Sequence, residues 1–337
     1  MSHRIGKRTI RLDNQVGIRS AAAVAGKKEG EGPLSKFFDK VYKDDLLGEE
    51  TWERAESRLQ HNAAECALAG AGMTADEIDA VFAGDLLNQC ISSTFGLESF
   101  SIPFLGQYGA CSTMAQAMLT AALLVDSGGL KNALAVTSSH FCSAERQFRL
   151  PIEYGGQRNL TAQWTVTGAG AAILSAEPSK IVVSDITVGK IVDMDIKDAD
   201  NMGAAMAPAA ADTISAYLSD SGTSAEDYDL ILTGDLGFVG SELLCELMKQ
   251  NKQDIAKQHN DCGKLIFSRT AQDVHAGGSG CGCCASVFCG YIMERLEYGE
   301  LKNILFAPTG ALLSPTSSQQ GESIPGICHL LHIKRND

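Results

Sequence analysis

The stretch Thr74-Ala-Asp-Glu-Ile-Asp-Ala-Val-Phe-Ala-Gly-Asp-Leu86 decides the fold, because it returns 150 residues later as Ser224-Ala-Glu-Asp-Tyr-Asp-Leu-Ile-Leu-Thr-Gly-Asp-Leu236. Each copy begins with a helix-capping Ser or Thr and an acidic turn. Each continues into a short apolar run that is typical of a buried strand. We therefore predict strands at 80–83 and 230–233, and an internal repeat.

A second pair of segments repeats in the same order. Gly129-Leu-Lys-Asn-Ala-Leu-Ala-Val136 resembles Glu300-Leu-Lys-Asn-Ile-Leu-Phe-Ala307. Two repeats in one order indicate a duplication. We divide the chain into two related halves, residues 1–177 and 178–337, and the first half carries an insertion at about 138–168.

Strands and helices are expected to alternate in each half. A β-rich start (Val16–Ala25 and Ile181–Val192) precedes a helical pattern (Thr51–Ala69 and Ala205–Ser219), followed by a strand, a helix and a strand. This alternation is typical of mostly parallel sheets that are covered by helices. The sequence therefore predicts an α/β protein.

Composition excludes several classes of protein. The 337 residues are 45% hydrophobic, enough for a full core, and carry a formal net charge of −13. An acidic surface repels phosphate backbones, so we expect no nucleic-acid partner. Met1–Ile10 lacks an apolar core and no run of about 18 apolar residues occurs, so we expect a soluble protein without a signal peptide or transmembrane segment.

Cys111 lies in the turn Gly109-Ala-Cys-Ser-Thr113, directly before an apolar, Ala-rich helix predicted at Met114–Val125. Free N–H groups and the dipole at the start of a helix favour a thiolate or a bound carboxylate. The alternative is that Cys111 is a small core residue, as most cysteines are. The local sequence leaves both readings open.

Together with the duplication, this turn resembles the thiolase and β-ketoacyl synthase superfamily, and most closely the stage V sporulation protein AD family of spore-forming bacteria. The resemblance covers about 16–332. The segments that carry it are Ser138-Ser-His-Phe-Cys142, Ala144-Glu-Arg-Gln-Phe148, Glu153-Tyr-Gly155, Thr161-Ala-Gln-Trp-Thr165 and Gly277-Gly-Ser-Gly-Cys-Gly282.

The resemblance implies a thiolase-like fold, layered α-β-α-β-α with two mixed sheets. It also implies noncatalytic binding of dipicolinic acid (pyridine-2,6-dicarboxylate), as the free acid or with calcium, in support of its uptake into the developing spore. The implied partners are membrane proteins of the same sporulation group, which would hold the chain at the spore inner membrane. A homo-oligomer, such as a homodimer, is also implied, and the apolar strand Asn132–Thr137 is our candidate for its boundary.

The chain departs from the condensing enzymes of that superfamily at two positions. Where those enzymes have a His after the strand matching 230–233, this chain has Gly234-Asp-Leu-Gly237. Where they have a second partner, Asn or His, in a Gly-rich turn, this chain has Ser279-Gly-Cys-Gly-Cys283, with Cys281 or a neighbour in its place. A thiol replaces neither an imidazole base nor an amide oxyanion donor. His275 is the only nearby substitute, so we predict that the chain is not an enzyme and that Cys111 is a vestigial nucleophile.

A planar dicarboxylate calls for forked donors, which arginine supplies. Each candidate has a structural alternative: Arg146 could form a surface ion pair, Arg158 could hold the insertion at a subunit boundary, and His140 could be a core histidine. The candidate ligand-binding residues are Cys111, His140, Arg146, Arg149, Arg158, Arg269 and His275.

No metal site or cofactor is predicted. Cys281, Cys283 and Cys284 lack a second ligand group at zinc-site spacing, and the acidic stretch 193–200 lacks the Gly and Glu of a calcium loop. Two other functions stay open. One is an acyltransferase or condensing enzyme that uses Cys111, and the other is a scaffold that recruits spore membrane proteins.

Overall fold

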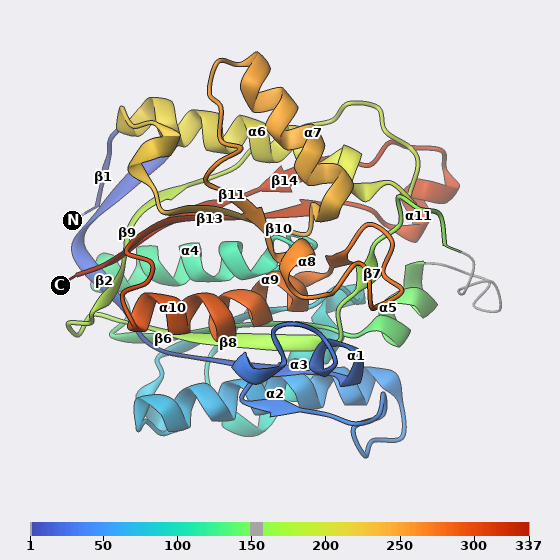
Figure 1. The fold of residues 1–337 in the computed structure, drawn as a ribbon. Helices are drawn as coiled ribbons and strands as arrows, with labels where there is room; N and C mark the ends of the chain where they lie inside the picture. The colour runs from blue at the N-terminus through green and yellow to red at the C-terminus, as the bar shows by residue number, and fades with distance from the viewer. Residues whose placement is uncertain (1, 149–157, 337) are drawn as a thin grey trace.

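The computed structural model describes residues 2–148 and 158–336 and has five layers (Figure 1). Helices α6 (Met202–Ser221) and α7 (Gly237–Gln250) cover one outer face. Helix α2 (Trp52–Ala71), with α3 (Ile91–Leu97), covers the other. The middle layer, between the strands of the two halves, contains α4 (Thr113–Asp126), α9 (Cys281–Val287) and α10 (Met293–Glu297). The predicted α-β-α-β-α layering is confirmed.

The two halves share one strand order, which confirms the duplication at the level of topology. The five main strands of the first half are β2 (Thr9–Ala25), β4 (Ala80–Gly84), β5 (Phe104–Gly106), β6 (Asn132–Ser139) and β8 (Gly168–Ser175). Those of the second half are β9 (Ile181–Thr187), β10 (Leu230–Gly234), β11 (His259–Asp261), β13 (Asn303–Ala311) and β15 (Leu330–Arg335). Counted in chain order within each half, both sheets run 3-2-4-5-1.

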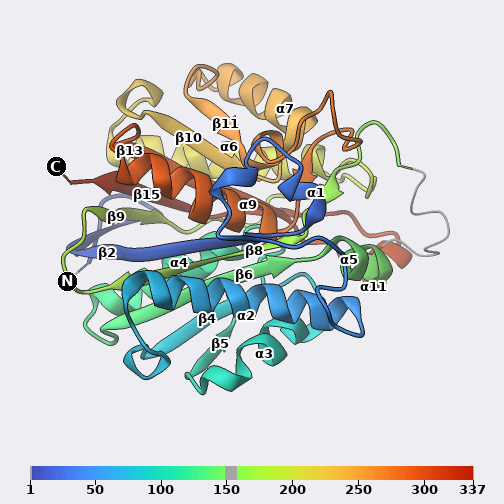
Figure 2. The ribbon, with the colours of Figure 1, turned by 60° about the horizontal axis from the view of Figure 1, so that its bottom comes forward.

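The two mixed sheets of the predicted architecture are joined edge to edge where β2 meets β9. Strand β2 pairs with β9 through Thr9–Gly17 and with β8 through Gly17–Ala25, so that one continuous sheet results (Figure 2). The register of β2 shifts between Arg11 and Val16 and again after Ile18. Such irregularities bend a strand, which lets one long strand serve both halves. A separate two-stranded sheet joins β7 (Trp164–Thr165) to β12 (Gly278–Ser279).

The two repeated sequence motifs meet in the same way in each half. In the first half, Asp79 Oδ2 accepts hydrogen bonds from the backbone N–H groups of Lys131 (2.6 Å) and Asn132 (2.9 Å). In the second half, Asp229 Oδ2 accepts from Lys302 (2.7 Å) and Asn303 (2.9 Å). The repeated Asp therefore anchors the start of the repeated Lys-Asn strand, which explains why both motifs persist.

The candidate subunit boundary at Asn132–Thr137 is wrong. This segment belongs to β6, which is buried along its whole length and is hydrogen-bonded to β4 on one side and β8 on the other. An apolar strand inside a sheet packs against its own chain. The exposed edge of the first-half sheet is β5.

No helix in the described part of the chain is long and apolar enough to cross a membrane.

Candidate functional site

Cys111 ends a strained turn that leads into α4 (Thr113–Asp126). Ala110 has a left-handed backbone with φ 49°. The hydroxyl groups of Ser112 and Thr113 donate to the carbonyl oxygens of Gly109 (2.7 Å) and Ala110 (2.5 Å). These bonds hold Cys111, 6% exposed, at the start of the helix as the sequence predicts.

The second half closes over this turn. A Cβ atom on Gly310 of β13 would lie 2.2 Å from the carbonyl oxygen of Gly109, so only glycine allows this approach. Cys281 begins α9 (Cys281–Val287) and belongs with Cys111 to one small buried cluster. The Cys284 thiol donates to the carbonyl oxygen of Cys111 at 3.3 Å. The sequence correctly places Cys281 beside the nucleophile position.

Asp235 is the carboxyl group that follows β10, where condensing enzymes are expected to have a histidine. It is fully buried, has φ 73°, and neither of its carboxyl oxygens has a hydrogen-bond partner among the described residues. Burial and the neighbouring Asp261 raise the pKa of Asp235 well above its usual range. Burial therefore favours the neutral form of Asp235, which makes it a poor base for the thiol.

The Cys111 thiol is also held in its neutral form. Burial, and then Asp235, raise the pKa of Cys111 well above its usual range, against a smaller opposing effect of the Gly280 backbone. A thiol without its proton is the nucleophile. The environment of Cys111 therefore disfavours the reactive species that the helix start alone would favour.

A small pocket of about 40 Å³, which we call the Cys111 pocket, opens beside this thiol. Its lining is mostly apolar, and Glu145 is its only charged side chain among the described residues; no His, Asn, Lys or Arg of the described chain lines it. The lining residues are Leu86, Tyr108, Ala110, Cys111, Ala144, Glu145, Phe148, Thr165, Met202, Ser279, Ala311 and Leu313.

Arg146 and His140, from the insertion, face other groups. Arg146 forms an ion pair with Glu53 and lies 5.2 Å from the ring centre of Trp52, and its side chain is 47% exposed. His140 is fully buried: Nε2 lies 2.7 Å from the carbonyl oxygen of Asp45, and Nδ1 accepts from the backbone N–H of Cys142. Both ring nitrogens of His140 are therefore occupied.

Arg158 and His275 are brought together, away from Cys111. Arg158 donates to Asp273 Oδ2 (2.9 Å) and stacks 4.5 Å from the ring centre of Trp164. His275 Nε2 lies 3.1 Å from Asp273 Oδ1. The Arg158 side chain is only 4% exposed, and its Nη1 has no hydrogen-bond partner. Together with Lys28, whose Nζ lies 3.6 Å from the ring centre of Trp164, these residues form a cationic cluster on the opposite side of β7 from the pocket residue Thr165.

The two other candidate arginines are not part of either group. Arg269 lies over the ring of Phe238 at 4.5 Å. Arg149 lies outside the described residues.

Buried carboxyl groups surround the Cys111 turn, and none of them is among the candidate residues predicted from the sequence. Asp85 and Asp235 occupy equivalent places in the repeated Gly-Asp-Leu motif. Asp85 accepts bonds from the backbone of Leu87 (2.9 Å) and the hydroxyl of Ser93 (2.6 Å), whereas Asp235 has no such donors. The repeated Asp at two strand ends was the signal that could have found them.

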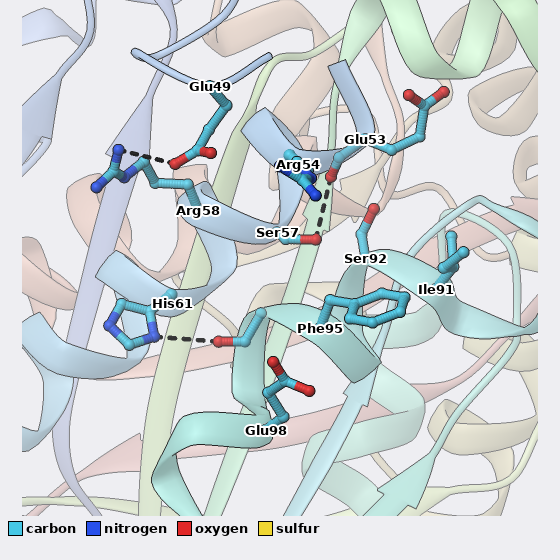
Figure 3. A pocket seen from close by; sticks show the side chains of 11 residues that line it. Glu49, Glu53, Arg54, Ser57, Arg58, His61, Ile91, Ser92, Phe95 and Glu98 are labelled. Atoms are coloured by element: carbon cyan, nitrogen blue, oxygen red, sulfur yellow. Dashed lines mark hydrogen bonds and ion pairs between the residues drawn. The ribbon is translucent and has the colours of Figure 1, made fainter. Parts of the chain in front are cut away.

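A second, wider cavity of about 550 Å³ lies between α2 and α3 (Figure 3). Arg58 pairs with Glu49 at 2.8 Å, and His61 contacts the carbonyl oxygen of Gly96 at 3.1 Å. Two other charged lining residues, Arg54 and Glu53, pair with Glu50 and Arg146, which lie outside the lining. No group of three or more His, Cys, Asp or Glu side chains in residues 2–148 and 158–336 could hold a metal ion.

The fold is similar to that of solved condensing enzymes. A 3-oxoacyl-[acyl-carrier-protein] synthase III from Aquifex aeolicus is 12% identical, with a TM-score of 0.57 over 95% of this chain and 99% of that one. A cerulenin-bound OleA from Xanthomonas campestris is 14% identical, with a TM-score of 0.61 over 95% and 97%. At such low identity these likenesses establish the thiolase-like fold and nothing about activity.

Similarity in sequence is much closer to a sporulation protein. Stage V sporulation protein AD of Bacillus subtilis (strain 168) is 47% identical over 330 residues, which cover 98% of this chain and 97% of that protein. The family model for stage V sporulation protein AD matches residues 6–334. The chain therefore belongs to the stage V sporulation protein AD family.

Proposed function

We propose that this chain binds dipicolinic acid without catalysing a reaction and thereby supports its uptake into the developing spore. The observation that carries the proposal is the state of Cys111: a buried, neutral thiol beside a pocket with no His or Asn among its described lining residues. A binding pocket has no need of a base, whereas a condensing enzyme does. The sporulation family supports the biological setting.

The charge of the pocket affects whether dipicolinate binds as the free dicarboxylate or as its calcium complex. Glu145 lines the pocket, whereas burial favours the neutral form of the nearby Asp235. A free dicarboxylate dianion is repelled by carboxylates, and a calcium complex is repelled less. Titration with and without calcium distinguishes the free acid from the complex as the bound form.

The size of the pocket requires a change on binding. Its volume of about 40 Å³ is far below the roughly 300 Å³ or more of typical ligand pockets. Phe148 and Leu313 contribute large side chains to its lining. We infer that these side chains move when the ligand enters.

Arg158 and Arg146 have different surroundings, so we expect their substitution to reduce the affinity for dipicolinate by different amounts. Arg158→Ala is expected to weaken dipicolinate binding by about tenfold, or about 1.4 kcal/mol, because Arg158 stacks on Trp164 of β7 and so holds the neighbouring pocket residue Thr165 in place. Arg146→Ala is expected to weaken it by at most about threefold, since its exposed pair with Glu53 already satisfies it. Calorimetric titration of both variants and the parent checks this. Equal losses in both variants would contradict the distinction, and no heat in the parent would favour the scaffold function.

The alternative enzyme function has its own test. The thiolase-like neighbours are enzymes, so acyl transfer through Cys111 is the second candidate function. Incubation with acyl-CoA thioesters followed by intact-mass measurement reports a covalent acyl group. We expect no adduct on Cys111; acylation with turnover would replace the binding proposal.

We also propose a homodimer that forms through the open edge of the first half. Strand β5 pairs only with β4 among the described strands, and Phe104 and Leu105 on it are 42% and 41% exposed. Phe95 of the neighbouring α3 is 60% exposed, beside the wide cavity of Figure 3. An open apolar edge is covered in stable proteins, because it otherwise pairs with other chains. Membrane contact, in this proposal, runs through membrane proteins of the same sporulation group.

Leu105→Lys is therefore expected to convert a dimer into a monomer at micromolar concentration, since it places a charge on the unpaired edge. Size-exclusion chromatography with light scattering measures the mass. Leu243→Lys is the matched control, because Leu243 on α7 is 40% exposed but lies on another face. A monomeric parent, or an unchanged mass for Leu105→Lys, would remove β5 as the interface.

A further inference from the structure

Cys245 and His259 form a thiol–imidazole pair far from Cys111 in the sequence and outside its pocket. Cys245 Sγ, on α7, lies 3.6 Å from Nδ1 of His259, on β11. Both side chains are partly exposed and line an open cavity of about 390 Å³. The lining residues of this second-half cavity are Ser241, Glu242, Cys245, Glu246, Lys249, Asp254, Ala256, His259 and Lys264.

A chain of hydrogen bonds fixes the tautomer of His259. Thr233 Oγ1 donates to Asp261 Oδ2 at 2.8 Å. A hydroxyl group has a single hydrogen, so Thr233 accepts its second bond, 2.8 Å long, from Nε2–H of His259. The neutral ring then carries its lone pair on Nδ1, which faces the thiol of Cys245. This is the arrangement of a general base held by a carboxylate through one hydroxyl group.

The charges around the pair keep it neutral at rest. Burial lowers the pKa of His259 to about 3, with a smaller contribution from Lys264, so the resting ring is neutral and its Nδ1 lone pair is available for the hydrogen bond from the Cys245 thiol. Burial raises the pKa of Cys245, and Lys264 partly offsets this. Burial raises the pKa of Asp261 to about 6, so this carboxyl is ionised above that pH and can stabilise a protonated His259. The other charged groups on the cavity wall are Glu242, Glu246, Lys249 and Asp254.

Ser241 gives an independent sign that the cavity receives a molecule. It lies four residues before Cys245 on α7, and hence on the same face of the helix. Its side chain is 3% exposed, lines the cavity, and its hydroxyl has no hydrogen-bond partner. A buried hydroxyl without a partner is costly, and a bound polar group in the cavity would satisfy it.

We propose that Cys245 is a modification site that exchanges with small-molecule disulfides, with His259 as the base. Cys245 Sγ attacks one sulfur of the disulfide, and its proton passes to His259 Nδ1. The new sulfur–sulfur bond joins Cys245 to one half of the reagent, and the old bond breaks. The other half leaves as a thiolate, which takes the proton from His259 and departs as a thiol. The small disulfide is the oxidant, so electrons and atoms balance. Lys264 beside the pair favours the negative charge that develops on sulfur.

The test compares three partly exposed cysteines within one folded chain. The full-length protein is treated with oxidised glutathione, quenched with acid at intervals, and mapped by peptide mass spectrometry. Cys66 and Cys142 are the internal controls, because they are also partly exposed and burial also raises the pKa of each. Cys245 is expected to form the mixed disulfide about tenfold faster than either, which is below the 10²–10⁴ of a well-matched general base because burial makes His259 a weak base.

Two variants test whether the rate at Cys245 depends on His259 as a base or only on the exposure of the thiol to solvent. His259→Gln keeps an amide near Thr233 but removes the acceptor at Nδ1, and is expected to reduce the Cys245 rate to that of Cys66. Thr233→Val is expected to reduce the increase in rate that the parent shows as the pH rises through about 6. Thermal melting reports whether each variant is folded. Equal rates at the three cysteines of the parent overturn the proposal, as does a folded His259→Gln variant that reacts as fast as the parent.

Discussion

Ala144→Phe is expected to weaken dipicolinate binding by more than about 100-fold, which corresponds to about 2.7 kcal/mol. Ala144, on α5 (Phe141–Phe148), is 3% exposed and lines the Cys111 pocket. A phenyl ring in a pocket of about 40 Å³ leaves no room for a second ring. Calorimetric titration measures the loss. Thermal melting checks the fold, because overpacking costs about 1–3 kcal/mol of stability.

Leu313→Ala is the matched control for this prediction. Leu313 lines the same pocket from the second half, and truncation enlarges the space instead of filling it. The affinity of the Leu313→Ala variant for dipicolinate is expected to equal or exceed that of the parent. A folded Ala144→Phe variant that binds like the parent would move the ligand away from Cys111, and the cationic cluster of Arg158 and His275 would then be the site to examine.

Asp185→Asn is expected to lower the free energy of unfolding by about 3 kcal/mol, the effect of breaking a buried ion pair. Asp185 Oδ1 accepts from Arg11 Nε at 2.7 Å, and Oδ2 lies 2.9 Å from His332 Nδ1 and 3.2 Å from the Tyr217 hydroxyl. The Asp185 side chain is 1% exposed. These contacts connect β2, β9, β15 and α6. Removing them therefore destabilises the junction between the two halves. Chemical denaturation measures it.

The pH dependence of stability follows from the same network. Burial opposes ionisation of Asp185, but hydrogen bonds from His332 and Arg11 outweigh it and hold the pKa of Asp185 below its usual range. Burial also lowers the pKa of His332, against a smaller effect of Asp185. In the unfolded chain both groups take up a proton at higher pH, near about 6.5 for His and about 4 for Asp. These two groups therefore make the protein less stable as the pH falls through those values.

The difference in stability between the parent and Asp185→Asn should be constant from about pH 7 to 5 and narrow below about pH 4, where the unfolded carboxylate is protonated. Glu50→Gln is the control, because Glu50 forms an exposed pair with Arg54 and is expected to cost at most about 0.5 kcal/mol. A loss for Asp185→Asn as small as that of Glu50→Gln would show that the buried network contributes little.

The architecture was largely predictable because the two halves of the chain carry the same pattern of strands and helices. The predicted strands at 80–83 and 230–233 are β4 and β10, each one residue longer, and the predicted helix at Met114–Val125 is α4 with one more residue at each end. Short apolar runs between capped turns depend on local sequence, so a second copy confirms each assignment. The joining of the two sheets through β2 was not predictable, because whether β2 also pairs with β9 is decided by long-range pairing.

The position of Cys111 was predictable from the sequence. The residues that the arginine side chains contact were not. A Gly-Ala-Cys-Ser turn before an apolar helix places the thiol at the helix start, whatever surrounds it. Arg146 and Arg158 are close in sequence, yet one pairs with Glu53 and the other with Asp273, more than a hundred residues beyond it. Long flexible side chains take their direction from partners that the local sequence does not name.

The sequence by itself determined the family, the duplicated α/β plan, and the lack of a histidine at the positions where condensing enzymes need one. Only the tertiary structure decided that β6 is internal and β5 exposed, that Asp235 is buried without donors, and that Cys245 meets His259. The physical reason is the distance along the chain over which each kind of interaction acts. Capping, periodicity and repeats act over a few residues, whereas burial and the pairing of charges depend on segments that the fold brings together from distant parts of the chain.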